Sequence, residues 1–138
     1  MPYASGEIVE RLAKMYYERY EVPIFISETA SLGTVKRRSD WLRDSVASTR
    51  RAREQGIPLV GYTWWPLFAL VTWAYRQGTK PPAYYIKQMG LWDLVADEKE
   101  DLARVRTELV GEFRKLAEGG PSAVGMVSNK VLRTQHVS

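Results

Sequence analysis

The stretch PIFISETAS, residues 23–31, joins a short apolar run to a carboxylate and a few small polar residues. Branched and aromatic side chains without charge, as in Ile24 to Ile26, are typical of a buried strand. Glu28 follows that run almost directly. A glutamate in this place has two interpretations: a solvated charge at a strand end, or a carboxylate that a pocket uses for chemistry.

A second run of this kind, IPLVGY at residues 57–62, follows one amphipathic segment later. That segment is predicted to be a helix that is capped by Ser39 or Asp40, runs to about Gln55 and is closed by Gly56. Two buried strands joined by one helix form a βαβ unit, in which the strands are parallel and the crossover is right-handed.

This unit predicts which side chains meet. We expect residues 23–27 and 57–62 to be parallel neighbours, so that Glu28 and the pair Trp64–Trp65 emerge at the same end of the sheet. Because neighbouring residues of a strand alternate between its faces, Trp64 is predicted to face away from the side on which Trp65 lies.

Helices are predicted on both sides of the βαβ unit. Residues 7–20 and residues 102–116 repeat apolar side chains at three- and four-residue spacing. Between them, residues 63–96 hold several prolines and glycines and are predicted to be a long irregular loop. The expected order is helix, strand, helix, strand, long loop and helix. Residues 1–118 are assigned to one domain and residues 119–138 to a flexible tail.

This order is incomplete as a fold. Two parallel strands do not make a stable sheet, and both of its faces and both of its edges need cover. The chain is therefore predicted to be the end of a larger α/β architecture. Its expected partner is either a second copy of itself or the missing N-terminal part of that architecture.

The composition excludes several kinds of site. The chain has 138 residues, no cysteine and one histidine, His136, so disulfides and Cys or His metal clusters cannot form. Neither a metal nor an organic cofactor is predicted. The net charge of +4 is mild and by itself does not predict nucleic-acid binding.

Neither the start of the chain nor its longest uncharged stretch predicts a membrane segment. The first residues lack the basic start and apolar core of a signal peptide, so a cytoplasmic location is expected. Residues 57–75 carry no charge, and that length can span a bilayer. However, Pro58, Gly61 and Pro66 interrupt the stretch, and its tryptophans lie in the middle rather than at the ends, where a membrane interface would place them.

Three pieces of the sequence, PIFISETAS, GIPLVGYTWWPLFALVTW and MGLWDL, resemble in this order the last part of glycoside hydrolase family 1 β-glycosidases and their divergent bacterial relatives. Strand seven of that family's (β/α)8 barrel ends in a segment of the type I-T-E-N-G, whose glutamate is the nucleophile, and residues 26–30 take this place. The family's G-Y, W-S-L and E-W segments correspond to Gly61-Tyr62, Trp65-Pro66-Leu67 and Thr72-Trp73. The divergent relatives carry G-L-W-D, as Gly90 to Asp93 do here.

The resemblance implies an α/β fold that is the C-terminal portion of a (β/α)8 TIM barrel. It implies hydrolysis of O-glycosidic bonds by a retaining mechanism, with Glu28 as the nucleophile and a carbohydrate or glycoside as the substrate. The family's acid/base residue follows strand four in an N-E-P segment that this chain does not contain, so the chain alone is expected to be inactive. The implied substrate-binding residues are Tyr62, Trp65, Thr72 and Trp73.

Several positions depart from the family pattern. Thr29 and Ala30 replace the asparagine and glycine that follow the nucleophile, and Thr72 replaces a sugar-gripping glutamate. Ala69 and Leu70 replace an acidic and an amide residue. These changes remove polar groups with which the family holds glucose or galactose.

Two other functions stay open. A truncated or degenerate barrel could bind carbohydrate or only pack against a partner, and Trp65 and Trp73 would then be core or lid residues. The basic segments VKRR at 35–38 and TRRAR at 49–53 would suit a small nucleic-acid-binding module. These arginines, however, are predicted to lie on the polar side of a helix or at its start, where solvated charge is normal. Neither a nucleic acid nor a membrane is therefore predicted as a partner.

Overall fold

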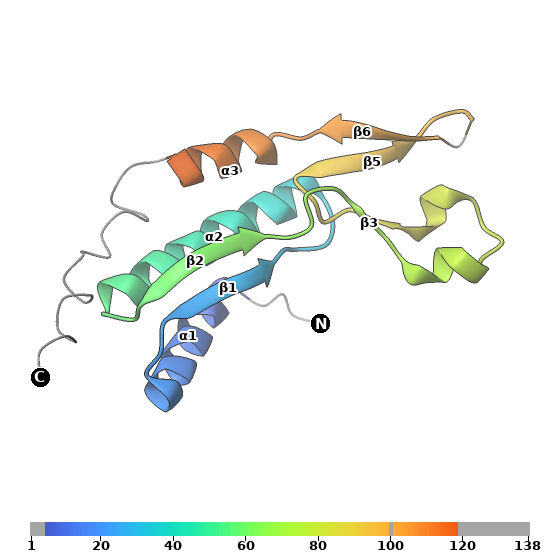
Figure 1. Cartoon of the computed structure of the whole chain (residues 1–138). Coiled ribbons are helices and arrows are strands. Elements are labelled where there is room, and N and C mark those ends of the chain that lie inside the picture. Colours follow the sequence, from blue (N-terminus) through green and yellow to red (C-terminus); the bar gives the residue numbers. More distant parts are fainter. Residues whose placement is uncertain (1–4, 100, 119–138) are drawn as a thin grey trace, which may run out of the picture.

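The computed structural model describes residues 5–99 and 101–118 and shows helices beside a small parallel sheet (Figure 1). The main elements follow one another as α1 (Glu7–Tyr20), β1 (Ile24–Thr29), α2 (Val35–Glu54), β2 (Leu59–Trp64) and α3 (Leu109–Glu118). Shorter elements lie between β2 and α3: β3 (Leu70–Val71), the 3-10 helices η1 (Trp73–Gln77) and η2 (Pro82–Tyr85), β4 (Ile86–Lys87), β5 (Trp92–Ala96) and β6 (Leu102–Arg106).

Strands β1 and β2 pair in parallel, which confirms the prediction from the two apolar runs. Ile24 lies opposite Leu59 near the start of the pair, and Thr29 lies opposite Trp64 at its end. The register shifts twice between these points, so the pair is irregular. Beyond the last pair, the Trp65 N–H donates to the Thr29 carbonyl at 3.1 Å. Glu28 and the two tryptophans therefore emerge at the same end of the sheet, as predicted.

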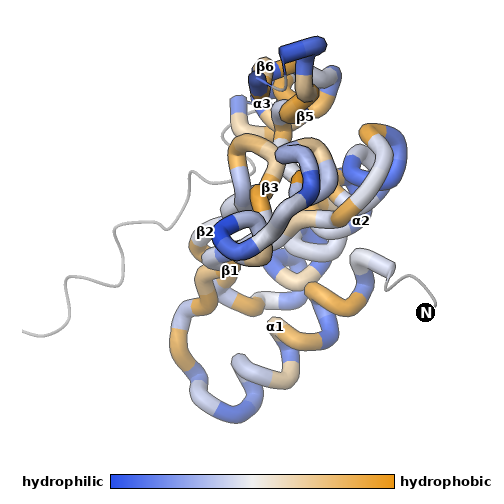
Figure 2. Tube along the Cα trace, turned by 90° about the vertical axis from the view of Figure 1, so that its right-hand side faces the viewer, coloured by the Kyte–Doolittle hydropathy of each residue, from blue (hydrophilic) through white to orange (hydrophobic). Residues whose placement is uncertain are grey.

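Two apolar clusters hold the helices against the sheet. The first joins α1, α2 and the strands through Ala13, Ala52, Ile57 and Leu59. The second joins α2, β2 and α3 through Leu42, Trp64, Leu91 and Leu109. Helix α1 thus lies beside β1, α3 lies beside β2, and α2 packs between them. Figure 2 shows the hydrophobic residues recurring along α1 between hydrophilic ones, as the amphipathic spacing predicts.

Helix α1 approaches α2 closely at its first turn. Gly6 is buried there, and a Cβ on this residue would lie 2.5 Å from the Asp44 carbonyl carbon. The helices are also joined by polar groups, because Glu10 accepts hydrogen bonds from Arg51 Nε at 2.8 Å and from Gln55 Nε2 at 2.7 Å. The hydrogen bond from Arg51 is the main reason that the pKa of Glu10 lies below its ordinary value.

Helix α2 begins earlier than predicted. It starts at Val35, and the Thr34 hydroxyl accepts a hydrogen bond from the Arg37 N–H at 3.3 Å as the N-cap. Ser39, which was expected to cap the helix, is buried inside it, and its hydroxyl donates to Glu112 of α3 at 2.8 Å. Both Thr34 and Ser39 are good capping residues by type, so the sequence alone favoured the wrong one.

The last predicted helix is partly wrong. Residues Leu102–Arg106 form β6, which pairs antiparallel with β5, and only Leu109–Glu118 are helical. The turn between the two strands is held by Asp97, whose Oδ1 accepts hydrogen bonds from two backbone N–H groups. The predicted long loop likewise contains the short antiparallel pair of β3 and β4. The predicted flexible tail, residues 119–138, lies outside the described residues.

The close approach of α1 to α2 predicts the effect of one added methyl group. Gly6→Ala should lower the free energy of unfolding by about 1–3 kcal/mol, since the new Cβ meets backbone atoms that cannot turn away. The thermal midpoint followed by circular dichroism measures this change.

The matched control is Gly111→Ala in α3, where an added Cβ meets nothing within 4 Å. This variant should keep or raise the midpoint, because alanine favours a helix interior by about 0.5–1 kcal/mol relative to glycine. Equal effects of the two substitutions would contradict the packing of α1 on α2.

Candidate active site

Glu28 lies near the carboxyl end of β1, next to the residue whose side chain reaches α2: Thr29 Oγ1 accepts a hydrogen bond from Trp41 Nε1 at 2.9 Å. Ile24 and Ile26 pack on the first apolar cluster, and the pairing is irregular between Ile26 and Thr29. The alternation of side chains is interrupted there, and Ser27 and Glu28 are both exposed. No hydrogen bond or ion pair holds Glu28 within residues 5–99 and 101–118. Glu28 is therefore presented at the open end of the strand and not used to hold the fold.

The two tryptophans after β2 have different environments. Trp64 is buried in the second apolar cluster, and its Nε1 donates to the Met89 carbonyl at 3.2 Å. Trp65, the next residue, is 44% exposed. Its N–H is bonded to Thr29, the residue beside Glu28. The structure thus brings Trp65 to the same end of the sheet as Glu28 and places Trp64 in the core.

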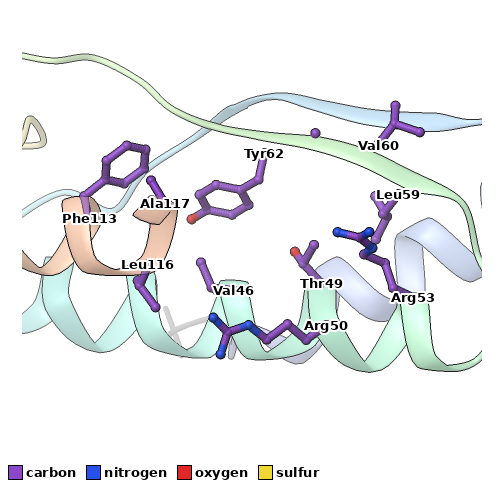
Figure 3. A pocket seen from close by; sticks show the side chains of 11 residues that line it. Val46, Thr49, Arg50, Arg53, Leu59, Val60, Tyr62, Phe113, Leu116 and Ala117 are labelled. Carbon is purple, nitrogen blue, oxygen red and sulfur yellow. The ribbon is translucent and has the colours of Figure 1, made fainter. Parts of the chain in front are cut away.

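The Tyr62 side chain points toward α2 (Figure 3), and its role among the substrate-binding residues stays a prediction. Its hydroxyl and the Ser45 hydroxyl of α2 are 2.8 Å apart. Burial raises the pKa of Tyr62 to about 12, against the opposing effect of hydrogen bonds with Ser45 and Thr29. The resemblance matched Tyr62 by sequence position, and in the structure its side chain lies against the helix layer.

Thr72 and Trp73 belong to a small lobe formed by β3, η1, η2 and β4. The Thr72 N–H donates to the Tyr85 carbonyl at 2.9 Å, which ties the two ends of the lobe together. Trp73 begins η1 and is 78% exposed, with the Arg76 guanidinium over its ring at 4.5 Å from the centroid. In Figure 1 the lobe lies beyond the carboxyl ends of β1 and β2. Trp73 is therefore a surface aromatic and not a core residue.

One hollow in the described part of the chain lies away from Glu28. It has a volume of about 190 Å³ and lies between the first half of β2, the second half of α2 and the end of α3. Figure 3 shows Tyr62 pointing into it, with Val46 and Phe113 beside it. Its lining is apolar apart from Thr49, the tyrosine hydroxyl and two arginines at the rim. This hollow holds no carboxylate and cannot be the site that Glu28 serves.

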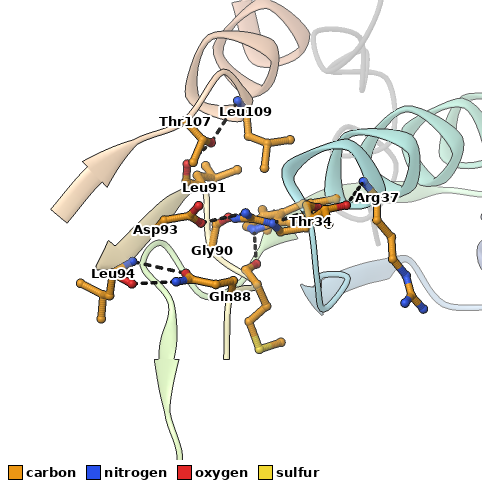
Figure 4. Close-up of polar contacts among 12 residues, drawn as sticks. Thr34, Arg37, Gln88, Gly90, Leu91, Asp93, Leu94, Thr107 and Leu109 are labelled. Carbon is orange, nitrogen blue, oxygen red and sulfur yellow. Dashed lines mark hydrogen bonds and ion pairs between the residues drawn. The ribbon is translucent and has the colours of Figure 1, made fainter. Parts of the chain in front are cut away.

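A buried arginine, which the sequence did not reveal, connects the segments behind the candidate site. Arg38 is 1% exposed, and its Nη1 donates to the Gly90 carbonyl at 2.6 Å. Its Nη2 lies 2.7 Å from Asp93 Oδ1, an oxygen without another partner among the described residues. Figure 4 shows Asp93 and Gly90 close together, with Thr34 nearby. The expectation that the arginines of VKRR are solvated is therefore wrong for Arg38.

Further hydrogen bonds connect the segments around the Arg38 contacts. The Gly33 N–H, just before α2, donates to the Gln88 carbonyl at 2.9 Å. The Gln88 side chain in turn makes two hydrogen bonds with the Leu94 backbone. Its Nε2 donates to the Leu94 carbonyl at 2.6 Å, and its Oε1 accepts from the Leu94 N–H. The Thr107 hydroxyl donates to the Leu91 carbonyl at 2.6 Å. The loop after β1 and the segment before β5 are thus held together by the buried Arg38–Asp93 ion pair and by hydrogen bonds to the surrounding backbone.

No feature of a membrane or metal site is seen in the part of the chain that the structure describes. None of its helices combines the length and the apolar character that a membrane crossing requires. No three His, Asp or Glu side chains of residues 5–99 and 101–118 are grouped so that they could hold a metal ion.

The buried pair predicts a large effect of Arg38→Ala. Removal of the guanidinium leaves the partly buried Asp93 carboxylate and the Gly90 carbonyl without their cation, which should lower the free energy of unfolding by about 3 kcal/mol. Urea unfolding followed by tryptophan fluorescence measures the change. The control, Lys36→Ala, breaks an exposed pair with Asp40 and should cost less than about 1 kcal/mol.

Burial of Tyr62 predicts an alkaline titration. The raised pKa means that the folded state keeps the proton where the unfolded state loses it, so this residue lowers stability as the pH rises from about 10 to about 12. The difference in ultraviolet absorbance between the wild type and Tyr62→Phe should therefore show tyrosinate forming near pH 12 in buffer and near pH 10 in urea. The same midpoint in both solvents would contradict the burial.

Comparison with known proteins finds similarity only at the level of structure. No family model and no curated protein matches the sequence. The fold is similar to part of the β-glycosidase from the hyperthermophile Thermosphaera aggregans, with a TM-score of 0.65 and 23% identity over 96% of this chain and 24% of that chain. For the psychrophilic β-glucosidase BglU from Micrococcus antarcticus, the TM-score is 0.67 at 17% identity over 83% of this chain and 24% of that chain.

The family 1 β-glucosidase from Thermotoga maritima gives the same result, with a TM-score of 0.64 and 20% identity over 83% of this chain and 26% of that chain. The chain spans about a quarter of the length of each of these enzymes. At such identities the likeness is one of fold. The chain is therefore an α/β unit with the fold of one part of a β-glucosidase barrel.

Proposed function

We propose that this chain supplies the nucleophile of a β-glycosidase-type active site, with Glu28 in that role and a retaining mechanism. The observation that carries the proposal is the position of Glu28, which is exposed near the carboxyl end of a parallel strand, at the same end as Trp65. Barrel enzymes place their catalytic side chains at this end of the strands. The fold likeness to β-glucosidases supports the same placement.

The chemistry requires a second carboxyl group from outside this chain. A retaining glycosidase uses two carboxyl groups about 5–5.5 Å apart, one as nucleophile and one as acid/base. In the first step a carboxylate oxygen of Glu28 forms a bond to the anomeric carbon, and the bond from that carbon to the aglycone oxygen breaks. The departing oxygen takes a proton from the acid/base residue. Water then releases the sugar with the same residue acting as base.

The aromatic residues near Glu28 suit a sugar. Trp65 is half exposed at the same end of the sheet, and its ring offers an apolar surface to one face of a pyranose. Trp73 and Thr72 are proposed as more distant contacts, since they lie in the lobe beyond the carboxyl ends. Thr72 offers a hydroxyl where the resemblance expects a carboxylate, so the preferred sugar is proposed to differ from glucose and galactose. A cytoplasmic location and the absence of a nucleic-acid partner stay predictions.

A second candidate function is non-catalytic carbohydrate binding by a degenerate barrel. It is favoured by Ala69 and Leu70, which are apolar where the resemblance expects an acidic and an amide side chain. This candidate keeps the aromatic platform at Trp65 but gives Glu28 no covalent role. The two candidates differ in whether neutralising Glu28 abolishes turnover.

The test is Glu28→Gln in the full chain, assembled with the polypeptide that completes the barrel and assayed with an aryl β-glycoside. Turnover should fall by at least about 10³-fold, because an amide of similar shape cannot form the glycosyl-enzyme bond. The control Glu18→Gln changes an exposed glutamate on α1 and should leave turnover unchanged. Full activity of Glu28→Gln would exclude the proposed nucleophile.

A second variant tests the stereochemistry. Glu28→Gly should regain turnover when sodium azide is added, since the small anion fills the vacated space and attacks the anomeric carbon from the same side. The expected product is a glycosyl azide of inverted configuration, detected by nuclear magnetic resonance. Azide rescue of Glu28→Gly with retained configuration would contradict the role of Glu28.

A further inference from the structure

The hollow between β2, α2 and α3 has no part in the candidate active site. Its volume is about 190 Å³, and its apolar walls come from three elements: Leu59 of β2, Val46 of α2, and Phe113 and Leu116 of α3. One aromatic ring or a short alkyl chain fits such a space, because an apolar cavity of about 150 Å³ accommodates benzene. The hollow therefore has the size and the lining of a site for a small apolar group.

The charged residues of the lining favour an anion. Arg50 and Arg53 of α2 line the hollow, and no carboxylate of the described residues does so. In Figure 3 the Arg50 guanidinium lies on the side of Val46. The Arg53 guanidinium lies on the side of Leu59 in the same view. Two positive charges thus flank the apolar space, and they attract a negative group of a molecule bound there.

Arg50 differs from two other arginines of α2, which are held by acidic side chains. Arg43 lies 2.8 Å from Glu112. Arg51 lies 2.8 Å from Glu10. Arg50 is exposed and makes no hydrogen bond or ion pair within residues 5–99 and 101–118. Its planar guanidinium can therefore donate two parallel hydrogen bonds to a carboxylate at the edge of the hollow.

The hydroxyl groups of the lining already have partners within the fold. Thr49 Oγ1 donates to the Ser45 carbonyl at 2.9 Å. The Tyr62 hydroxyl lies 2.8 Å from the Ser45 hydroxyl. The inner part of the hollow therefore suits an apolar group, and the place for a charged group is the rim beside Arg50.

We propose that this hollow binds a small amphipathic carboxylate, with its phenyl or short alkyl group between Val46 and Phe113 and its carboxylate on the Arg50 guanidinium. The apolar part then leaves water, while the charge stays at the rim with a cation. A sugar does not suit this lining, because its hydroxyls would face apolar walls without hydrogen-bond partners. The proposal does not depend on the role of Glu28.

The experiment is a titration of the full chain with 3-phenylpropionate and with its neutral counterpart, 3-phenylpropionamide, followed by nuclear magnetic resonance and calorimetry. The acid should bind at least about tenfold more tightly than the amide, because only the acid forms charge-assisted hydrogen bonds with Arg50. The backbone amide signals of Thr49 and Gly61, which line the hollow, should shift on binding.

Two results of this titration would overturn the proposal. One is equal affinity for the acid and the amide, which would leave Arg50 without a role. The other is the absence of binding at the hollow, whether the ligand shifts signals elsewhere or other residues of the chain fill the space.

A pair of variants tests the role of the guanidinium. Arg50→Gln should weaken binding of the acid at least about tenfold and leave binding of the amide unchanged, since glutamine cannot supply the charge. The matched control is Arg11→Gln, because Arg11 is exposed on α1 and lies outside the lining. Equal weakening by both variants would show an effect of net charge alone and would contradict the proposed contact.

A second pair tests the apolar part of the site. Ala117 of α3 lines the hollow and is exposed, so Ala117→Phe should occupy the space and abolish binding of both the acid and the amide. Lys115→Phe is the control, since Lys115 is exposed on α3 outside the lining. Unchanged affinity of Ala117→Phe would exclude the hollow as the site. If circular dichroism shows that Ala117→Phe alters the fold, the Arg50 and Arg11 variants decide.

Discussion

The parallel pairing of β1 with β2 is the constraint on which the rest of the structure depends. It brings the carboxyl ends of two strands together, so that the residue after one strand lies beside the residue after the other. Thr29 and Trp64 form the last pair, and each is tied to the helix layer or the core by its side chain. Their neighbours Glu28 and Trp65 are exposed at the same end of the sheet. The candidate site is thus a consequence of the parallel pairing.

The Arg38 pair explains why the segments behind this site keep their positions. A guanidinium with three partners costs less to bury than one with a single partner, since its charge and its N–H groups are satisfied together. The Gly90 carbonyl and Asp93 lie in the G-L-W-D stretch, and Thr34 lies at the start of α2. Asp93 is therefore explained by support of the loop after β1, and a catalytic role for it is not needed.

The sequence predicted the elements whose signal is local. The two apolar runs and the helix spacing of residues 7–20 needed no knowledge of distant contacts, and α1 has the predicted bounds. The start of α2 was missed because Thr34 and Ser39 cap equally well by type, and only the packing against Glu112 distinguishes them. Leu102 and Val105 fit a helical spacing and also a strand, and the pairing with β5 decided between the two.

The candidate site, like the fold, could be predicted only in part. The parallel pairing predicts that Glu28 and Trp65 lie at the same end of the sheet, whereas a sequence match carries no information about the direction of the Tyr62 side chain, which points toward α2. Arg38 was wrongly predicted to be solvated, because nothing near it in the sequence indicates its ion pair with Asp93, which lies far along the chain. Long-range polar contacts of this kind leave no periodic pattern for sequence analysis to detect.

The central claim is that Glu28 attacks the anomeric carbon of a sugar. The most direct measurement is peptide mass spectrometry after the assembled barrel has reacted with 2,4-dinitrophenyl 2-deoxy-2-fluoro-β-glucoside, whose leaving group departs without help from an acid. The glycosyl ester should be found on the peptide that contains residues 23–31, at Glu28. An ester on any other carboxylate of the assembly, with Glu28 unmodified, would contradict the account.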